Sequence, residues 1–525
     1  MAQTEKDATR IMFTISNTSK NYLSRISGAG HLPVILLFVV ISFFHLWRIS
    51  DIPRGLGRDE LSIGYNASLI AGTGYDEHHH FFPTFFEAFG EFKNPLYIYA
   101  VSLIFRLFGV SEYGLRVTSF VFFFLFLAGF HLLVTKIFRE NRTISLYALL
   151  SAGFLPWFFP LSRIAYEVVS QLTMVIYSLL FVYLSYHPEQ TKYERLYPAL
   201  AGLFLGLSVY SYSTARLLSF LLLLSVVLVY LRRGTVKKSM IIVSMFSVSL
   251  VPYLMFAANN PGALTRRFER ISYLYDSSAP VFEKMITFLK RYHSYTGLDF
   301  LLFGGDRNLR HATGYGGEVF IVVFVLCAVG LVWLMIHQQA LKDKFALLMF
   351  VNLLLSPCAA SLTTGRTNAV RSVLVGLYIL VFSCYGLASL LRMKEGMRRG
   401  ILIGAVFVAL LSQASLYLTE YFTNYEKESA IWFETYGFKD ALITAVERGP
   451  KRIIVEKTKW AYVCAAFYKN FIHNPRQIPI SVGTAVPEND VCIIYFERTK
   501  HDSPPHPDEL EISGPGNKPV RLRCY

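Results

Sequence analysis

The chain has 525 residues, of which 53% are hydrophobic and 17% are charged, whereas soluble proteins usually carry about 25% charged residues. Its formal net charge is +15, but no RNA- or DNA-binding motif accompanies that charge. These values exclude an ordinary soluble protein and argue against a nucleic-acid partner. They favour a multi-pass membrane protein whose cytoplasmic loops collect Lys and Arg.

The first 31 residues are polar and basic, and an apolar run at 32–50 follows them. This run is long enough to span a bilayer, and the basic residues before it predict a cytoplasmic N-terminus. The next apolar stretch, 95–109, is short and contains Arg106, so we predict an interfacial or re-entrant helix on the outer face. Further spans are predicted near 116–135, 144–160, 167–186, 198–214, 217–231, 239–257, 317–337, 345–362, 372–391 and 400–418.

The predicted inner loops, 192–195, 232–238, 341–344 and 392–399, are all basic. Counting 95–109 as a full span would place them outside, against the positive-inside rule. We therefore expect an α-helical polytopic protein of the cell (inner or plasma) membrane with about eleven transmembrane helices. Its transmembrane domain covers 32–418, follows a cytoplasmic segment at 1–31, and contains long outer segments at 51–115 and 258–316.

The tail at 419–525 is predicted to be a small extracytoplasmic α/β domain. Its apolar runs favour strands at 452–456 and 491–496, and its tip at 503–519 is rich in turn residues. Cys464, Cys492 and Cys524 lie in this tail. Because three is an odd number, at most one disulfide forms among them within the chain.

The first outer segment carries dense polar chemistry, including Asp59, Glu60 and the run His78 to His80. A carboxylate at the membrane rim can accept a proton from an attacking hydroxyl, or it can hold a divalent cation. Asp59 can instead cap the helix that follows it. Adjacent histidines cannot all point one way, so at most two of His78 to His80 could bind one metal ion together. Glu60, His79 and His80 are the candidate metal ligands, and a solvated loop is the plainer interpretation.

Arginines recur at the predicted outer ends of the spans. Snorkelling toward lipid phosphates explains many of them. Guanidinium groups also match phosphate oxygens in a bidentate geometry, so a site for a lipid phosphate in the outer leaflet is an equally open interpretation. The residues concerned are Arg58, Arg116, Arg163, Arg216, Arg266, Arg267, Arg270, Arg307, Arg310, Arg366 and Arg371.

An ordered set of motifs begins with RDELSIGYNASLIAGTG and FKNPLYIYAVSLIFRLFGVSEYGLRVTS. It continues with LSRIAYE, GLSVYSYSTARLL, LDFLLFGGDRNLRHATGYGG and SLTTGRTNAVRSVL. This set resembles the GT-C glycosyltransferases, in particular the protein O-mannosyltransferases and aminoarabinose transferases (glycosyltransferase families 39 and 83). The resemblance covers roughly 30–420, and the order of the motifs is more specific than any one of them.

The resemblance implies an inverting transfer of a sugar from a polyprenyl phosphate in the outer leaflet to an acceptor hydroxyl. It implies Asp59 as the general base and Glu60 as an acid that orients Asp59 or a divalent metal. The phosphate leaving group needs positive charge rather than an acid. Candidates to bind the donor phosphate are Lys93, Arg163, Arg216, Arg310 and His311. Tyr97 and Tyr212 are candidates to stack on the isoprenoid or the sugar.

One departure from the aminoarabinose transferases is Phe92, which precedes Lys93 where that group has Glu. Two other functions also fit outward arginines: a flippase or transporter of lipid-linked glycans, and a polysaccharide ligase. A transporter is expected to carry ionisable residues at mid-membrane depth, whereas these span interiors are nearly uncharged. A ligase gives no special place to Asp59 and Glu60. We therefore predict a hexosyl- or pentosyltransferase whose acceptor is a lipid, a protein or a glycan.

Overall fold

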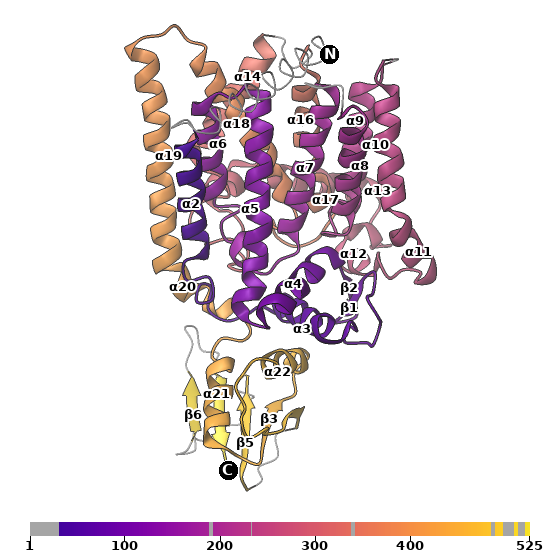
Figure 1. Ribbon diagram of the computed structural model, residues 1–525, viewed down its shortest axis with the longest axis vertical. Coiled ribbons are helices and arrows are strands. Elements are labelled where there is room, and N and C mark those ends of the chain that lie inside the picture. The colour runs from indigo at the N-terminus through magenta and orange to yellow at the C-terminus, as the bar shows by residue number, and fades with distance from the viewer. Residues whose placement is uncertain are drawn as a thin grey trace, which may run out of the picture.

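The computed structural model describes residues 31–187, 193–232, 234–337, 342–484, 489–496, 509–512 and 520–525. The predicted segment 1–31, apart from its last residue, and most of the predicted tip at 503–519 lie outside the described residues. The described chain forms a helical bundle that carries a small α/β domain at one end (Figure 1).

Within the described residues, six helical segments are long and apolar enough to cross a membrane, which confirms the membrane character expected from composition. They are α5 (Glu112–Ile137), α7 (Val168–Tyr186), α10 with α11 (Val236–Ser249 and Val251–Asn259), α16 with α17 (Lys344–Leu355 and Cys358–Ser361), α18 (Val373–Leu391) and α19 (Met397–Thr423). Shorter helices occupy the other predicted spans: α2 (Leu32–Leu46), α6 (Arg142–Phe154), α8 (Leu196–Val209), α9 (Ala215–Tyr230) and α14 (Ile321–Ile336).

Two of the predicted spans are broken near their ends by proline. Pro252 lies in the first turn of α11, directly after α10 ends, and Pro357 is the N-cap of α17, directly after α16 ends. Proline lacks an N–H donor, and its ring clashes with the carbonyl of the preceding turn. Each span therefore becomes a long helix followed by a short one.

The most buried helix of the bundle is α18, whereas α10 and α19 expose most of their apolar residues at its periphery. Close packing of α14 against α18 depends on Gly330 and Gly386. A Cβ atom at Gly330 would overlap the backbone of Phe382 and Gly386, and one at Gly386 would overlap the backbone of Leu326. Small residues allow such close approach of helices in membranes.

The predicted outer segments fold across the end of the bundle that carries the α/β domain (Figure 1). The first contains α3 (Arg58–Thr73), the hairpin of β1 (Phe86–Ala88) and β2 (Glu91–Lys93), and α4 (Pro95–Phe108). The second contains α12 (Arg266–Ile271), η3 (Tyr273–Tyr275), α13 (Val281–Thr296) and η4 (Asp299–Phe303), followed by a loop at 304–318.

Helix α19 continues to Thr423, past the predicted start of the tail, and α20 (Tyr425–Glu428) and η5 (Ala430–Trp432) lead into the α/β domain. Its sheet has the order β4-β3-β5-β7-β6, and α21 and α22 accompany it. The bounds are α21 (Phe438–Arg448), β3 (Arg452–Glu456), α22 (Ala461–Lys469), β4 (Ile480–Gly483), β5 (Val491–Tyr495), β6 (Glu509–Ile512) and β7 (Val520–Cys524). The predicted strands thus correspond to β3 and β5. One disulfide, Cys492–Cys524, joins register partners on β5 and β7.

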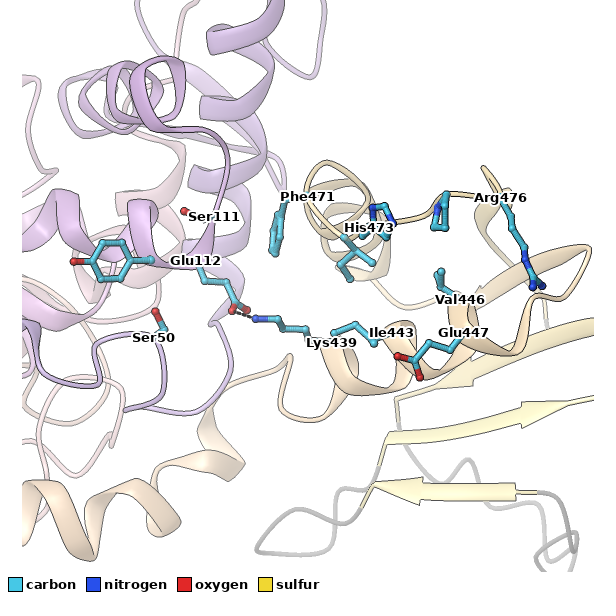
Figure 2. A pocket seen from close by; sticks show the side chains of 13 residues that line it. Ser50, Ser111, Glu112, Lys439, Ile443, Val446, Glu447, Phe471, His473 and Arg476 are labelled. Carbon is cyan, nitrogen blue, oxygen red and sulfur yellow. Dashed lines mark hydrogen bonds and ion pairs between the residues drawn. The ribbon is translucent and has the colours of Figure 1, made fainter.

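The α/β domain is fastened to the bundle by polar contacts at its edge. Lys439 Nζ donates to Glu112 Oε2 at 2.6 Å, and the Tyr468 hydroxyl donates to Glu112 Oε1 at 2.6 Å. A cavity of about 620 Å³ lies beside these contacts, between α5 and the residues of α21 and the loop after α22 (Figure 2). None of the predicted site residues lines this cavity.

Candidate active site

The acidic pair sits at the first turn of α3, where its two side chains take different directions. Gly57 is the N-cap residue, and its N–H donates to Glu60 Oε2 at 2.9 Å in a capping box. Capping is therefore the work of Glu60 and not of Asp59, contrary to the predicted alternative. Asp59 is left free to point toward the basic residues at this end of the bundle.

Asp59 forms an ion pair with Lys93, the last residue of β2. Lys93 Nζ donates to Asp59 Oδ1 at 2.6 Å, and the side chain of Asp59 is 48% exposed whereas that of Lys93 is 7% exposed. The Lys93 ammonium group, helped by Arg267 and opposed by burial, holds the pKa of the Asp59 carboxyl well below its ordinary value. The carboxylate is thus ionised at neutral pH and faces open space on one side.

A cavity of about 240 Å³ lies beside this pair, where α3, α12, the loop 304–318 and the residues before α18 meet. Five residues predicted from the sequence line it together, although they come from separate parts of the chain. They are Asp59, Lys93, Tyr212, Arg310 and His311. We call this cavity the reaction pocket.

The reaction pocket also contains residues that were not among the predicted site residues. Arg267, Arg371, Glu167 and Asn368 line it. Arg267 and Arg371 stood among the outward arginines, and Glu167 and Arg371 lie inside two of the resembling motifs, LSRIAYE and SLTTGRTNAVRSVL. The sequence spacing of Arg267 and Arg371 did not distinguish them from arginines that snorkel to the lipid, because the residues that they meet in the pocket are distant in the sequence.

Several basic side chains of the pocket are held in place by acidic partners. Glu434 accepts from Arg58 Nε at 2.8 Å and from Arg310 Nη2 at 2.7 Å. Glu91 lies 3.2 Å from Arg267 Nη1 and so anchors that arginine. These pairs fix the directions of the guanidinium groups and leave donors available toward the pocket.

His311 is held by a second carboxylate in the loop 304–318. Its Nδ1 lies 2.8 Å from Asp306 Oδ2, which also accepts from the Ala369 N–H at 2.9 Å. Asp306 is buried and thus ties the loop to the segment before α18. His311 also lines the reaction pocket.

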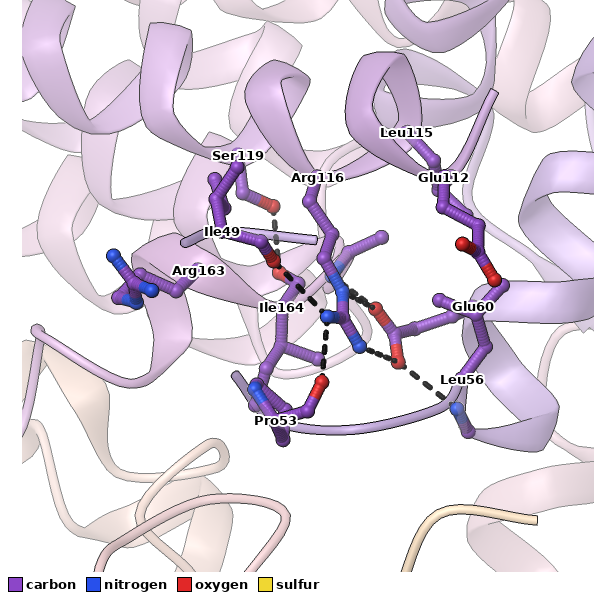
Figure 3. A network of polar contacts seen from close by, with 12 residues as sticks. Ile49, Pro53, Leu56, Glu60, Glu112, Leu115, Arg116, Ser119, Arg163 and Ile164 are labelled. Atoms are coloured by element: carbon purple, nitrogen blue, oxygen red, sulfur yellow. Dashed lines mark hydrogen bonds and ion pairs between the residues drawn. The ribbon is translucent and has the colours of Figure 1, made fainter. Parts of the chain in front are cut away.

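Glu60 does not line the reaction pocket, and this differs from its predicted role beside Asp59. It is fully buried and accepts from Arg116 Nε at 3.1 Å and from the Ala165 N–H at 3.0 Å. Arg116 also donates to the carbonyls of Ile49 and Pro53, so the pair holds the chain after α2 against α5 (Figure 3). Glu60 therefore acts in the structural network behind the pocket.

Arg163 and Tyr97 are likewise placed away from the reaction pocket. Arg163 is buried and donates to the carbonyls of Phe44 at 2.7 Å and His45 at 2.6 Å, so that it satisfies the C-terminal end of α2. Tyr97 is buried, and its hydroxyl lies 2.6 Å from Ser119 Oγ. Neither residue lines the reaction pocket.

Arg216 lines a neighbouring cavity of about 350 Å³. Its Nη2 donates to Asn94 Oδ1 at 3.0 Å. This second cavity shares Tyr212, Arg267 and Arg371 with the reaction pocket, and its remaining lining is largely apolar. We call it the apolar annex.

The predicted metal ligands do not converge. Glu60 is occupied by Arg116, whereas His80 Nδ1 lies 3.2 Å from Asp76 Oδ2 in the loop after α3. Among the described residues no group of three or more His, Cys, Asp or Glu side chains is arranged to hold a metal ion. A divalent-cation site built from Glu60, His79 and His80 therefore does not fit this structure.

The fold resembles known proteins. A family model described as dolichyl-phosphate-mannose-protein mannosyltransferase matches residues 93–256. The structure of ArnT from Cupriavidus metallidurans aligns with a TM-score of 0.54 at 12% identity, covering 93% of this chain and 97% of that one. The Archaeoglobus fulgidus oligosaccharyltransferase aligns with a TM-score of 0.55 at 13% identity, covering 88% and 69%.

The chain has the GT-C fold. The family match begins at Lys93 and includes Glu167 and Tyr212, but Asp59 and Arg310 lie outside it. The structure of ArnT from Cupriavidus metallidurans bound to undecaprenyl phosphate aligns equally well, with a TM-score of 0.54 at 12% identity. The alignment covers 94% of this chain and 98% of that one. No curated protein sequence matches the chain significantly.

Proposed function

We propose that this protein transfers a sugar from a polyprenyl-phosphate donor to an acceptor hydroxyl at the face of the membrane where the α/β domain lies. The observation that carries the proposal is the convergence of one half-exposed carboxylate, Asp59, with several cationic side chains in the reaction pocket. The GT-C fold supports it, since the related structures with this fold include ArnT bound to undecaprenyl phosphate. The sugar is a hexose or a pentose.

The charge of the pocket suits a phosphate leaving group. Its lining holds five basic side chains against three acidic ones. The basic residues are Arg58, Lys93, Arg267, Arg310 and Arg371, and the acidic ones are Asp59, Glu167 and Glu434. Cations placed where negative charge develops stabilise the transition state, so a departing phosphate monoester needs no proton donor.

The apolar annex offers a path for the lipid part of the donor. It adjoins the pocket through Tyr212, Arg267 and Arg371, and its other walls include Phe92, Leu217 and Phe268. A donor whose phosphate lies between the two arginines would place its first isoprene units against these walls. Arg216, which lines the annex, would then approach the lipid side of the phosphate.

Asp59 serves as the base. The acceptor oxygen attacks the anomeric carbon from the face opposite the phosphate, the bond from that carbon to the phosphate oxygen breaks, and the acceptor proton passes to the Asp59 carboxylate. The polyprenyl phosphate leaves with the bonding electron pair, and the configuration inverts. A phosphate near Lys93 competes for its ammonium group, so donor binding would release Asp59 from its partner and raise its basicity.

The decisive experiment compares wild type with Asp59→Asn in purified full-length protein. A panel of radiolabelled polyprenyl-phosphate sugars is supplied with membrane extract as the acceptor source, and labelled acceptor is measured. We expect Asp59→Asn to lower the rate by about 10²- to 10⁴-fold, the range for loss of a general base. Asp51→Asn is the matched control, because Asp51 is an exposed acid outside the pocket.

No transfer from any donor, or equal rates for wild type and Asp59→Asn, would contradict the proposal. Movement of the intact donor across the membrane without loss of its sugar would instead favour a transporter. The same assay with a chelator tests metal dependence. We expect transfer to persist, because the cationic side chains of the pocket supply the charge that a metal would otherwise supply.

A further inference from the structure

A cavity of about 390 Å³ lies between the α/β domain and the segment that links it to α19. Counting after the reaction pocket and the apolar annex, we call it the third cavity. One wall is formed by residues of the linking segment, including Trp432 and Tyr436, and the opposite wall by residues of the domain, including Trp460 and Lys459. This volume falls in the range of about 300–1,000 Å³ that is typical of sites for small ligands. The function proposed above does not use this cavity.

The third cavity is continuous with the reaction pocket. The two share Arg58, Arg310 and Glu434. Glu434 accepts from both arginines and forms a bridge between them. Since Arg58 directly precedes Asp59 on α3, a molecule held in the third cavity needs only to extend past this bridge to bring an oxygen to the base.

Two tryptophans supply flat, partly exposed faces in the third cavity. The Trp432 carbonyl accepts from Arg310 Nε at 2.6 Å, and the guanidinium carbon of Arg310 lies 5.7 Å from the centroid of the Trp432 ring. Trp460 precedes α22 and packs edge to face on Phe496 with centroids 4.3 Å apart. Both rings are therefore fixed by their neighbours, so a ligand that stacks on them loses little side-chain conformational entropy.

We infer that the third cavity binds a saccharide, the sugar part of the acceptor whose hydroxyl receives the transferred residue. This inference rests on the proposed transferase function. Rigid aromatic faces suit the C–H face of a pyranose ring, and Lys459, Arg58 and Arg310 offer donors to its hydroxyl groups. An extended peptide would be expected to pair with a sheet edge, but no residue of the edge strand β4 lines the cavity.

The test measures binding without turnover, so that it does not depend on an identified donor. Full-length protein in phosphatidylethanolamine–phosphatidylglycerol nanodiscs is titrated with a panel of hexoses, N-acetylhexosamines, pentoses and their disaccharides, and saturation-transfer NMR is recorded. We expect at least one saccharide to bind, and Trp460→Ala or Trp432→Ala to weaken its binding at least tenfold. Trp460→Phe, which keeps an aromatic face, should restore most of the affinity.

Trp333→Phe is the control, because Trp333 lies on α14 against Arg392, outside the cavity. Binding of undecaprenyl phosphate is measured on the same samples and should be unchanged in the Trp432 and Trp460 variants. Absence of saccharide binding at millimolar concentration, or binding unaffected by both tryptophan variants, overturns the inference. So does binding of a Ser- and Thr-containing peptide panel that the tryptophan variants abolish. If wild type binds a saccharide but does not bind undecaprenyl phosphate, the result counts against the proposed function and not against the saccharide site.

Discussion

Asp59 and Glu60 are neighbours in sequence, yet their chemical environments are opposite. Successive residues on a helix are separated by about 100°, so the first turn of α3 sends one carboxylate into the pocket and the other into the core. Asp59 meets the Lys93 ammonium group and is 48% exposed, whereas Glu60 meets a fully buried arginine. The pocket residue is thus available for proton transfer and the core residue is not.

The Asp59–Lys93 pair makes a prediction about pH dependence. Because Lys93 lowers the pKa of Asp59 in the folded protein, the pair stabilises the fold at pH values above the ordinary carboxyl pKa of about 4, and this contribution is lost as the pH falls through the lowered value. The acid limb of kcat/KM for wild type should accordingly lie below about pH 4. In Lys93→Met we expect this limb to move to higher pH.

Lys93→Arg keeps the positive charge and is the control for the pH profile. It should retain a low acid limb even if its rate falls, because the guanidinium group still favours the ionised carboxylate. An acid limb that is identical in wild type, Lys93→Met and Lys93→Arg would show that a group other than Asp59 controls the profile.

The Glu60–Arg116 pair makes a prediction about stability. Glu60→Gln removes the charge that compensates a fully buried guanidinium group, and breaking such a pair typically costs about 3–5 kcal/mol. We expect a marked drop in the thermal unfolding temperature of the purified protein. Glu283→Gln, a change at an exposed acid on α13, should leave that temperature unchanged. Full stability together with lost transfer in Glu60→Gln would instead assign Glu60 a direct role in catalysis.

Sequence reasoning located the pocket residues whose motifs were distinctive and failed where only burial decides. Lys93, Arg310 and His311 were found, and they share the pocket with Asp59. Arg163 resembled them in sequence, because it too is an arginine at a predicted outer end of a span. Only the fold shows that its donors are consumed by carbonyls at the end of α2.

At the scale of elements, α4 is the helix on which the predicted topology depended. It has 14 residues, and it exposes Leu103 (59%), Leu107 (64%) and Phe108 (79%) at the end of the bundle. A short helix with an exposed apolar face suits the boundary between headgroups and acyl chains. The short length of the apolar stretch 95–109 predicted a short helix here. The proline breaks after α10 and α16 were not predicted, because the hydrophobicity of those spans is continuous.

The placement of α4 is testable by the depth of a spin label. A label at Leu107→Cys should lie about 5–10 Å into the interface, as amphipathic interfacial helices do. A label at Phe124→Cys, on an exposed face midway along α5, should lie near the bilayer centre, and one at Lys394→Cys should be accessible to water. Equal depth at 107 and 124 would mean that α4 spans the membrane, which would reverse every later segment.

At the scale of the whole molecule, the two ends of the bundle differ in composition and in structure. Successive long helices alternate in direction, so the loop between α18 and α19, at 392–396, lies at the end opposite the α/β domain (Figure 1). That loop belongs to the basic set that predicts a cytoplasmic side. The reaction pocket and the Cys492–Cys524 disulfide lie at the other end. Disulfides persist in oxidising compartments, so both features support an extracytoplasmic α/β domain.

Cysteine labelling in intact spheroplasts tests this orientation. Arg448 at the end of α21 and Lys394 after α18 are both exposed, and a membrane-impermeant maleimide should react with Arg448→Cys but not with Lys394→Cys until the cells are permeabilised. Wild type is the background control, because the free thiols of Cys327, Cys384 and Cys464 are buried, whereas that of Cys358 is only partly buried and its labelling must be subtracted. If only Lys394→Cys reacts in intact spheroplasts, the pocket faces the cytoplasm. The donor would then lie in the inner leaflet, and the assignment of an outer-face transferase would be wrong even if Asp59 is the base.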